Sequence, residues 1–428
     1  MTSLITRQRL LRLASFSSTQ LIVQMIGFGS GILLVRYMVQ AQYGYYTLAV
    51  SMAGMAVTLC DLGLATAVMA RGGRLANERA ALGALVADAY ALHRRLAWGM
   101  LAVLIPCCVA LLWWQQTPLW QMAALTVLIV ATALLGVRAG VALSIVRLLG
   151  HVGFQQKLDL AVNLAKLAVL VAATWLVLDA TIACLVNLAV AAVSYLALVR
   201  HLDAHVELPA RAPGLDRPAL REHLWKQAPN TVYFVCSSQL ALWLIGVFGS
   251  AERVAEVGAL GRLGALFTLI GSVSSALVLP YFARRHQPGE LASGFVGVNA
   301  FYACLLATLL VFAWVAPAPI LWVLGGNYAG LQAELIWMVA AATLSAWGGA
   351  IYGIACARAW VMPVSLSIST GMLATVGAAL LVDVSTVRGS FMINTAAGLA
   401  GTLAAVGYFA WKLRHHMSPT GLGLEGRR

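Results

Sequence analysis

The sequence predicts an all-α integral membrane protein with twelve transmembrane helices in two repeat-related six-helix lobes around a central cavity. Three observations support this fold class. First, 61% of the 428 residues are hydrophobic and only 10% are charged, whereas soluble domains average about 25% charged residues. Second, twelve apolar stretches are each long enough to cross a bilayer, which takes about 20 residues. Third, the basic residues concentrate in every second connection between these stretches, as they do in cytoplasmic loops.

The predicted spans follow one another along almost the whole chain. They cover residues 13–38, 45–70, 96–114, 120–146, 158–178, 180–199, 228–248, 257–280, 294–315, 331–355, 363–382 and 389–411. The longest predicted cytosolic loop lies in the middle of the chain and contains three prolines, which is typical of a linker. We therefore expect an N-terminal lobe at residues 1–204, a linker at 205–227, a C-terminal lobe at 228–411 and a cytosolic tail at 412–428.

The 28 basic residues predict how the spans are oriented. Twenty-two of them lie in seven short segments on one side of the predicted topology, and only Arg253 and Arg388 lie in the opposite loops. Because Lys and Arg near the ends of membrane helices stay on the cytoplasmic side, both termini are predicted to be cytosolic. The remaining four fall inside predicted spans: Arg36, Arg138, Lys166 and Arg262.

The two halves of the sequence resemble each other. Gly44 and Arg71 bracket the second span, and Gly258 and Arg285 bracket the eighth; each pair is separated by 27 residues, and the two pairs are offset by 214. Six spans per half keep the halves in the same orientation, as in the parallel repeats of some transporters. The pattern favours a two-lobed transporter that works by alternating access.

Polar residues line one face of four spans, which the repeat relates in pairs. Such residues are expected to point into the protein rather than into lipid. They are Ser17, Gln20, Gln24, Gly27 and Gly31 in the first span; Thr47, Ser51, Gly54, Thr58 and Asp61 in the second; Asn230, Tyr233 and Ser237 in the seventh; and Arg262, Ala265, Thr268, Ser272 and Ser275 in the eighth. A shared polar cavity would explain all four faces, with Gln24, Asn230 and Tyr233 lining it. The alternative is that the small residues, such as Gly27 and Gly31, are helix-packing seams.

The basic residues inside the spans are candidates for a substrate site, because an ionised side chain at a helix centre costs about 2.5 to 3.5 kcal/mol. Arg36 and Arg262 lie close enough to the outer ends of their spans to reach the interface, so they either line the cavity or anchor the helices there. Arg138 and Lys166 lie deeper. They are expected either to form a structural cluster with Asp159 or to bind an anionic headgroup of the phosphate type.

The two acidic residues inside the spans, Asp61 and Asp159, are the candidates for ion coupling. Asp61 lies deep in the second span, in the sequence CDLGL, with no basic neighbour along its own helix. Ionisable residues at such depth often mark proton or ion pathways. The alternative is that Asp61 pairs with a basic residue of another helix, either Arg36, Arg138 or Lys166.

Several classes of function lack their sequence signature. No GxxxxGK[ST] motif for ATP hydrolysis occurs, and no Ser/His/Asp or metal-binding constellation is recognisable, so we predict no enzyme activity, cofactor or metal site. The eight histidines all fall in predicted cytosolic loops or the tail. The net charge of +13 is explained by anionic lipids and insertion bias rather than by nucleic-acid binding.

Three segments, in order along the chain, resemble a known transporter family. They are RYMVQAQYGYYTLAVSMAGM followed by DLGLATAV, EVGALGRLGAL followed by LPYFARR, and PILWVLGGNYAGLQAELIWM. In the first, Arg36, Tyr43, Gly44, Asp61 and Gly63 fill the places of an Arg, a Tyr-Gly and a deep Asp-x-Gly. These segments are similar to the polysaccharide and oligosaccharide flippases, of the O-antigen flippase type, in the multidrug/oligosaccharidyl-lipid/polysaccharide exporter (MOP) superfamily. The seventh span departs from the family, because QLALWLIGVFG lacks a charged residue near its outer end.

The resemblance implies a flippase of the bacterial inner membrane. It would move a polyprenyl-pyrophosphate-linked oligosaccharide from the cytosolic to the periplasmic leaflet for the synthesis of O-antigen, exopolysaccharide or capsule. Membrane lipids, a polysaccharide polymerase, a chain-length regulator and H⁺ or Na⁺ as coupling ion are the implied partners. Two alternatives remain: an ion-coupled drug/cation antiporter of the same superfamily, which would need an acidic cavity, and a non-transporting scaffold for glycan enzymes.

Overall fold

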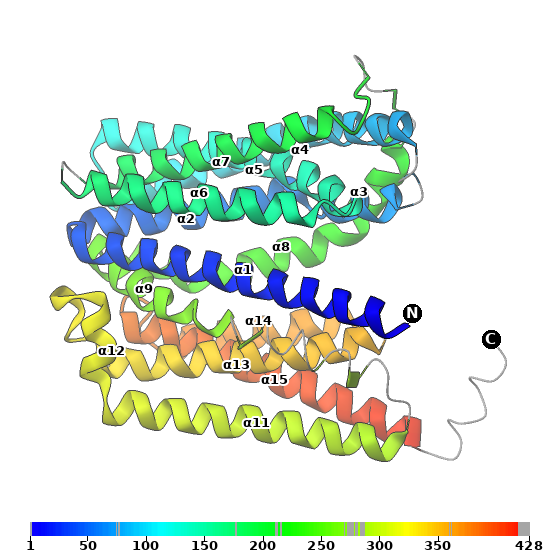
Figure 1. Cartoon of the computed structure of the whole chain (residues 1–428). Coiled ribbons are helices and arrows are strands. Elements are labelled where there is room, and N and C mark those ends of the chain that lie inside the picture. The colour runs from blue at the N-terminus through cyan, green and yellow to red at the C-terminus, as the bar shows by residue number, and fades with distance from the viewer. Residues whose placement is uncertain are drawn as a thin grey trace. The chain divides into compact units, whose positions relative to one another are not determined.

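The computed structural model describes residues 2–417 except 74, 76–77, 176–177, 210–212, 215, 269, 272–277, 279–280, 283–286, 359 and 361, with side chains from Thr19 onward apart from those of residues 230, 288, 416 and 417. The described residues form α-helices and one 3-10 turn, with no strand among them. The chain divides into two units, Met1–Gln239 and Leu240–Arg428. Figure 1 shows that the long helices within each unit lie side by side.

The first unit contains seven complete helices and most of an eighth. Their bounds are α1 Thr2–Tyr37, α2 Gln40–Asp61, α3 Leu64–Gly72, α4 Arg79–Trp114, α5 Leu119–Leu148, α6 Val152–Ala173, α7 Ala180–Asp203 and α8 Arg217–Phe248. Helix α5 packs against α2, α3, α4 and α7, and α1 packs along α6. A large part of the core lies where α3, α4, α5 and α7 meet, around Leu64, Leu85, Val141, Ile145 and Leu202.

The second unit contains the end of α8 and the helices that follow it. Their bounds are α9 Ala251–Gly264, α11 Pro288–Val315, α12 Pro317–Leu324, the 3-10 turn Gly326–Tyr328, α13 Gln332–Ala357, α14 Val364–Leu381 and α15 Val387–Met417. Helix α13 packs against α11 and α15, and α14 packs against α15. Phe282, Phe295 and Phe409 form an aromatic core together with Ile351 and Ile354.

Ten of the twelve predicted spans coincide with helices that are long and apolar enough to cross a bilayer. In the described part of the chain, nine are single helices and the tenth is the bent pair α2 and α3. The predicted span 158–178 falls mainly on α6, which has the length of a span but carries Lys157, Asp159 and Lys166. The predicted span 257–280 begins in α9, and much of its second half lies outside the described residues.

Several helices begin earlier in the chain than the predicted spans, and α4 and α8 show the reason. Helix α4 starts at Arg79 rather than at residue 96, and α8 starts at Arg217, inside the segment expected to be the linker. The physical reason is that both extensions are amphipathic. Leu85 and Val86 of α4 and Leu220 of α8 are buried in the core of the first unit, so the helices continue beyond the apolar stretch.

The segment that follows α7 crosses α4 closely at Gly83. A Cβ added at Gly83 would lie 1.7 Å from the carbonyl oxygen of Glu207. Gly83→Ala should therefore displace this segment and lower the free energy of unfolding by about 1 to 3 kcal/mol, which thermal unfolding of the purified protein in detergent would measure.

The matched control is Gly99→Ala in the same helix, because a Cβ at Gly99 would meet no atom within 4 Å. It should leave the melting temperature unchanged or raise it, since Ala favours a helix over Gly by up to about 1 kcal/mol. Equal destabilisation by both variants would show that the close crossing at Gly83 does not limit the side chain there.

Candidate functional site

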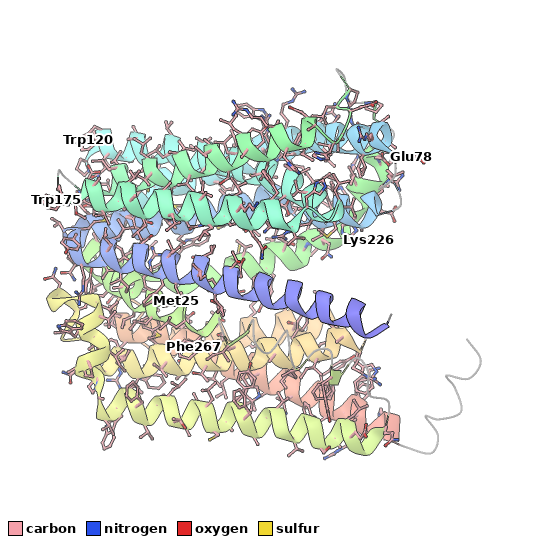
Figure 2. The ribbon with its side chains drawn as sticks, viewed as in Figure 1. Met25, Glu78, Trp120, Trp175, Lys226 and Phe267 are labelled. Atoms are coloured by element: carbon pink, nitrogen blue, oxygen red, sulfur yellow. The ribbon has the colours of Figure 1, made fainter. Side chains whose placement is uncertain are left out.

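The two ends of the first unit differ in chemistry. Glu78 and Lys226 lie at one end, and Trp120 and Trp175 lie at the other (Figure 2). The first end carries the α3–α4, α5–α6 and α7–α8 connections, with most of the basic residues of this unit, and we call it the basic end. The side chains of Trp120 and Trp175 are 63% and 85% exposed, as expected of tryptophans at a membrane interface.

Arg138 lies half-buried in α5, and its neighbours come from α4. The Tyr90 hydroxyl donates a hydrogen bond to the carbonyl oxygen of Arg138 at 3.4 Å, and the guanidinium interacts electrostatically with Tyr90 and His93. Among the charged residues that the structure describes, none forms an ion pair with Arg138. Since Arg138 is ten residues from the end of α5, about 15 Å along the helix, its charge is placed well inside the bundle.

His93 is a candidate that the sequence analysis missed. The prediction that every histidine lies in a loop or the tail is wrong for His93, which lies within α4 and is 1% exposed. Its ring nitrogens are near the carbonyl groups of Cys60 and Leu134, but neither nitrogen forms a hydrogen bond of normal geometry. The buried imidazole therefore lies against the backbone of two neighbouring helices and close enough to Arg138 to interact with it electrostatically.

Lys166 and Gln24 come from helices that pack along each other, α6 and α1. Lys166 is half-buried, 14 residues from the start of α6, which is about 21 Å along the helix. It interacts electrostatically with Cys184 of α7. The side-chain oxygen of Gln24 is buried without a hydrogen-bond partner. Because a buried acceptor without a partner costs about 1 to 3 kcal/mol, Gln24 is suited to receive a hydrogen bond from a ligand or from water.

Asp159 is connected to Arg147, at the basic end. Gln155 donates a hydrogen bond to the Asp159 carboxylate at 3.2 Å and accepts one from the Arg147 side chain at 3.0 Å. Asn163 donates to the backbone carbonyl of Asp159 at 2.8 Å. Among the described residues, Asp159 therefore forms no ion pair with Arg138. It is linked through Gln155 to Arg147 at the end of α5.

Asp61 lies at the bend between α2 and α3. Leu62 and Gly63 adopt left-handed backbone conformations, with φ of 45° and 88°, and the two helices meet at 43°. The Asp61 carboxylate accepts hydrogen bonds from the backbone N–H groups of Gly63 and Ala65, both at 3.1 Å. Asp61 therefore stabilises the start of α3, a capping role that the sequence analysis did not anticipate.

The polar face of α2 reaches α8. Ser51 donates a hydrogen bond to the side-chain oxygen of Gln239, which places a residue of the predicted second-span face against the helix that contains the seventh span. The hydroxyl groups of Thr47 and Thr58 bond instead to carbonyl oxygens four residues earlier in their own helix. Such internal bonds satisfy the hydroxyl group without any partner in a cavity.

The glycines of these faces are not all needed for close helix packing. A Cβ added at Gly27 or Gly54 would meet no atom within 4 Å. Neither glycine is therefore in close contact with another helix of its own unit.

The structure describes the other predicted site residues by their helix position and burial. Arg36 is exposed at the end of α1, and Tyr233 is half-buried in α8. Arg262 is half-buried in the last turn of α9. Asn230 lies in α8, but its side chain is outside the described part of the structure, as are those of Ser17, Ser272 and Ser275.

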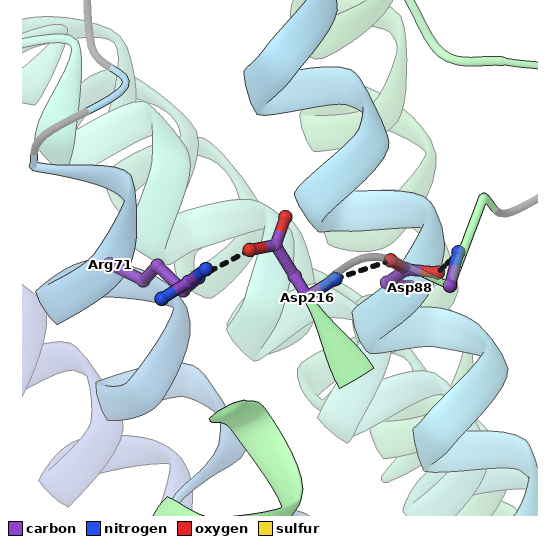
Figure 3. Close-up of polar contacts among 4 residues, drawn as sticks. Arg71, Asp88 and Asp216 are labelled. Carbon is purple, nitrogen blue, oxygen red and sulfur yellow. Dashed lines mark hydrogen bonds and ion pairs between the residues drawn. The ribbon is translucent and has the colours of Figure 1, made fainter. Parts of the chain in front are cut away.

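A polar network at the basic end joins the segment before α8 to α3 and α4, and no sequence pattern indicated it. Asp88 of α4 is completely buried and accepts hydrogen bonds from the backbone N–H groups of Gly214 and Asp216, at 2.7 and 3.1 Å. It also accepts one from the Arg217 side chain at 3.1 Å. Asp216 in turn pairs with Arg71 at the end of α3 (Figure 3). The network fixes the segment before α8 onto α3 and α4.

A second cluster brings together three histidines that are not grouped in the sequence. His151, His201 and His205 each offer a ring nitrogen, and these atoms lie within 4.8 Å of one another. The three residues come from the start of α6 and the end of α7.

No family model matches the chain, and no curated protein matches it. Solved structures do. A lipid II flippase, MurJ in an inward closed conformation, aligns with a TM-score of 0.75 over 93% of this chain and 87% of that chain, at 10% sequence identity. A MOP superfamily transporter from Pyrococcus furiosus gives a TM-score of 0.63 over 95% and 96% of the two chains, at 15% identity. A MATE transporter in complex with MaD3S gives 0.61 over 94% and 95%, also at 15% identity.

The chain therefore has the fold of multi-pass membrane transporters. More particularly, it shares this fold with a lipid II flippase, a MOP superfamily transporter and a MATE transporter. The predicted all-α, two-lobed membrane architecture and the predicted resemblance to MOP exporters are confirmed at the level of the fold.

Proposed function

We propose that this protein is a flippase that moves a polyprenyl-pyrophosphate-linked oligosaccharide from the cytosolic to the periplasmic leaflet by alternating access. The surroundings of Arg138 are the main support for this proposal. A cation held about 15 Å inside a helix, beside a buried histidine and without a carboxylate partner among the described residues, suits an anionic ligand. A guanidinium forms two parallel hydrogen bonds with phosphate oxygens, and these are strengthened by charge.

The remaining candidate residues have subordinate roles in this proposal. Lys166 supplies a second positive charge, and Gln24 and Tyr233 contact the sugars or the diphosphate. Asn230 is assigned to the same surface from its sequence position, and Arg36 and Arg262 either meet the headgroup or anchor the helix ends. The polyprenyl chain remains in the lipid. We place the protein in the bacterial inner membrane with both termini cytosolic, in a pathway that supplies O-antigen, exopolysaccharide or capsule.

Deletion of the gene in its native host tests the proposal. Lipid-linked repeat units should accumulate in the cytosolic leaflet while surface glycan disappears, and re-expression of the protein should restore the glycan. Unchanged surface glycan with no accumulation of the precursor would refute the flippase assignment.

A second candidate function is ion-coupled export of drugs or cations, because solved MATE transporters share the fold. This function would need an acidic binding surface. The first unit instead presents Arg138 and Lys166 inside the bundle, while Asp61 caps a helix and Asp159 is linked to Arg147. The charge of these residues favours an anionic substrate over a cationic one.

Asp61→Asn tests ion coupling separately from capping. The asparagine oxygen can still accept a hydrogen bond from a backbone N–H group, so we expect the variant to fold and insert but to lose export of the glycan, because it cannot exchange a proton or neutralise Na⁺. Surface glycan and the amount of membrane-inserted protein would be measured together.

The matched control for Asp61 is Asp179→Asn. Asp179 caps α7 by accepting a hydrogen bond from the N–H of Ile182 at 2.7 Å, and it is not a candidate for coupling. It should retain export, since Asn and Asp are similar helix caps. Normal export by Asp61→Asn would eliminate Asp61 as the coupling residue.

A further inference from the structure

Three histidines meet at the basic end of the first unit. His151 immediately precedes α6, His201 lies in the last turn of α7, and His205 lies in the turn that follows. Nε2 of His201 is 2.9 Å from Nδ1 of His151. The centroid of the His205 ring lies 4.5 Å from the centroid of the His201 ring and 4.6 Å from that of the His151 ring. All three side chains are half-buried, so they are held in place yet remain accessible to an ion.

The ring of His205 is oriented by the backbone. Its Nδ1 lies 2.7 Å from the carbonyl oxygen of His201. Because a carbonyl oxygen only accepts, Nδ1 must carry the proton, which leaves a lone pair on Nε2. Metal-binding histidines are commonly fixed in this way by a hydrogen bond from the other ring nitrogen. Phe154 stacks on the His201 ring at 4.0 Å with an interplanar angle of 11°, which fixes a second ring.

We propose that His151, His201 and His205 bind one divalent transition-metal ion of the zinc class. Three imidazoles are a ligand set that Zn²⁺ accepts, with a fourth position left to water or another ligand. Zinc–nitrogen bonds of about 2.0 to 2.1 Å place neighbouring nitrogens about 3.3 Å apart. The His151 and His201 nitrogens therefore separate by a few tenths of an ångström, and the proton they share moves to the other nitrogen of its ring.

The positions of the three histidines along the chain determine which helices a bound ion would connect. His201 and His205 are four residues apart, so they lie on the same side of a helical turn, and His151 approaches them from the start of the preceding helix. A bound ion would join the start of α6 to the end of α7 at the basic end of the first unit. The proposal does not depend on the transported substrate.

The site is tested with the full-length protein, purified in detergent after removal of any histidine tag. Titration with Co²⁺ should produce the visible absorption of a four-coordinate cobalt site with about one equivalent bound, and Zn²⁺ should displace it. His201→Gln and His205→Gln should each weaken Co²⁺ binding by at least about 100-fold, since even loss of an outer partner of a ligand costs about 10- to 100-fold.

Two further variants make the result decisive. His223→Gln removes a histidine of α8 that is not one of the three ligands and should leave the titration unchanged. His205→Cys supplies a thiolate in place of the imidazole and should retain binding with an altered spectrum, which shows that the position is a ligand rather than a requirement for folding. Absence of stoichiometric Co²⁺ binding, or equal binding by His201→Gln and the wild type, would overturn the proposal.

Discussion

Replacing Arg138 with glutamine should slow translocation of the lipid-linked glycan by about 10- to 100-fold. A hydrogen bond to a charged group contributes about 1.5 to 3 kcal/mol, and each 1.4 kcal/mol corresponds to a factor of ten. Arg138 has no ion-pair partner among the described residues, so glutamine removes a ligand for the diphosphate without leaving a carboxylate unpaired. Surface glycan per inserted protein molecule is the measurement, and Arg138→Lys should restore part of the activity because it retains the charge.

Arg95→Gln is the control for Arg138→Gln. Arg95 is exposed in α4, only two residues beyond His93, so its replacement makes the same change in net charge without removing a proposed ligand. Export should remain at the level of the wild type. If both variants lost export equally, the effect would be one of total charge or insertion, and the specific role of Arg138 would be refuted.

Replacing Asp88 with alanine should have the largest effect on stability, about 3 kcal/mol. Removing one partner of a buried ion pair costs about 3 to 5 kcal/mol, and the lower figure applies because Arg217 is 32% exposed. Two backbone N–H groups also lose their acceptor. For a protein of this size, a loss of about 3 kcal/mol corresponds to a melting temperature lower by about 3 °C, and thermal unfolding in detergent would show it.

Glu222→Gln is the matched control for the loss of a carboxylate from an ion pair. Glu222 pairs with Lys226 at 2.6 Å, but their side chains are 68% and 74% exposed. An exposed pair of this spacing contributes little to stability because solvent screens it, so the melting temperature should change little. A similar melting temperature for Asp88→Ala and the wild type would contradict the structural role of the network.

Helix positions and fold class could be predicted from the sequence because they depend on local properties. A stretch of about 20 apolar residues must form a helix in lipid, where every backbone group has to be bonded within the segment. The bend at Asp61 was also encoded locally, by an aspartate that can cap a helix and a glycine that adopts positive φ. The sequence DLG fits both a charge in the membrane and a helix boundary, and the structure shows the boundary.

The polar networks could not be predicted because their members are distant in sequence. Asp88 and Gly214 are separated by 126 residues, and His151 and His201 by 50. Helical periodicity shows which residues share a face but not which face of another helix they meet. His93 was missed for a related reason: the amphipathic start of α4 is helical beyond the apolar stretch, so a histidine assigned to a loop is in fact buried beside Arg138.

Translocation by the purified protein in proteoliposomes tests the central claim most directly. A polyprenyl-pyrophosphate-linked oligosaccharide would be placed in one leaflet, and its arrival in the other leaflet would be followed with a membrane-impermeant enzyme that modifies the glycan. The account predicts rapid transfer by the wild type and transfer about 10- to 100-fold slower by Arg138→Gln. Transfer by the wild type at the rate of protein-free liposomes would contradict the proposed function.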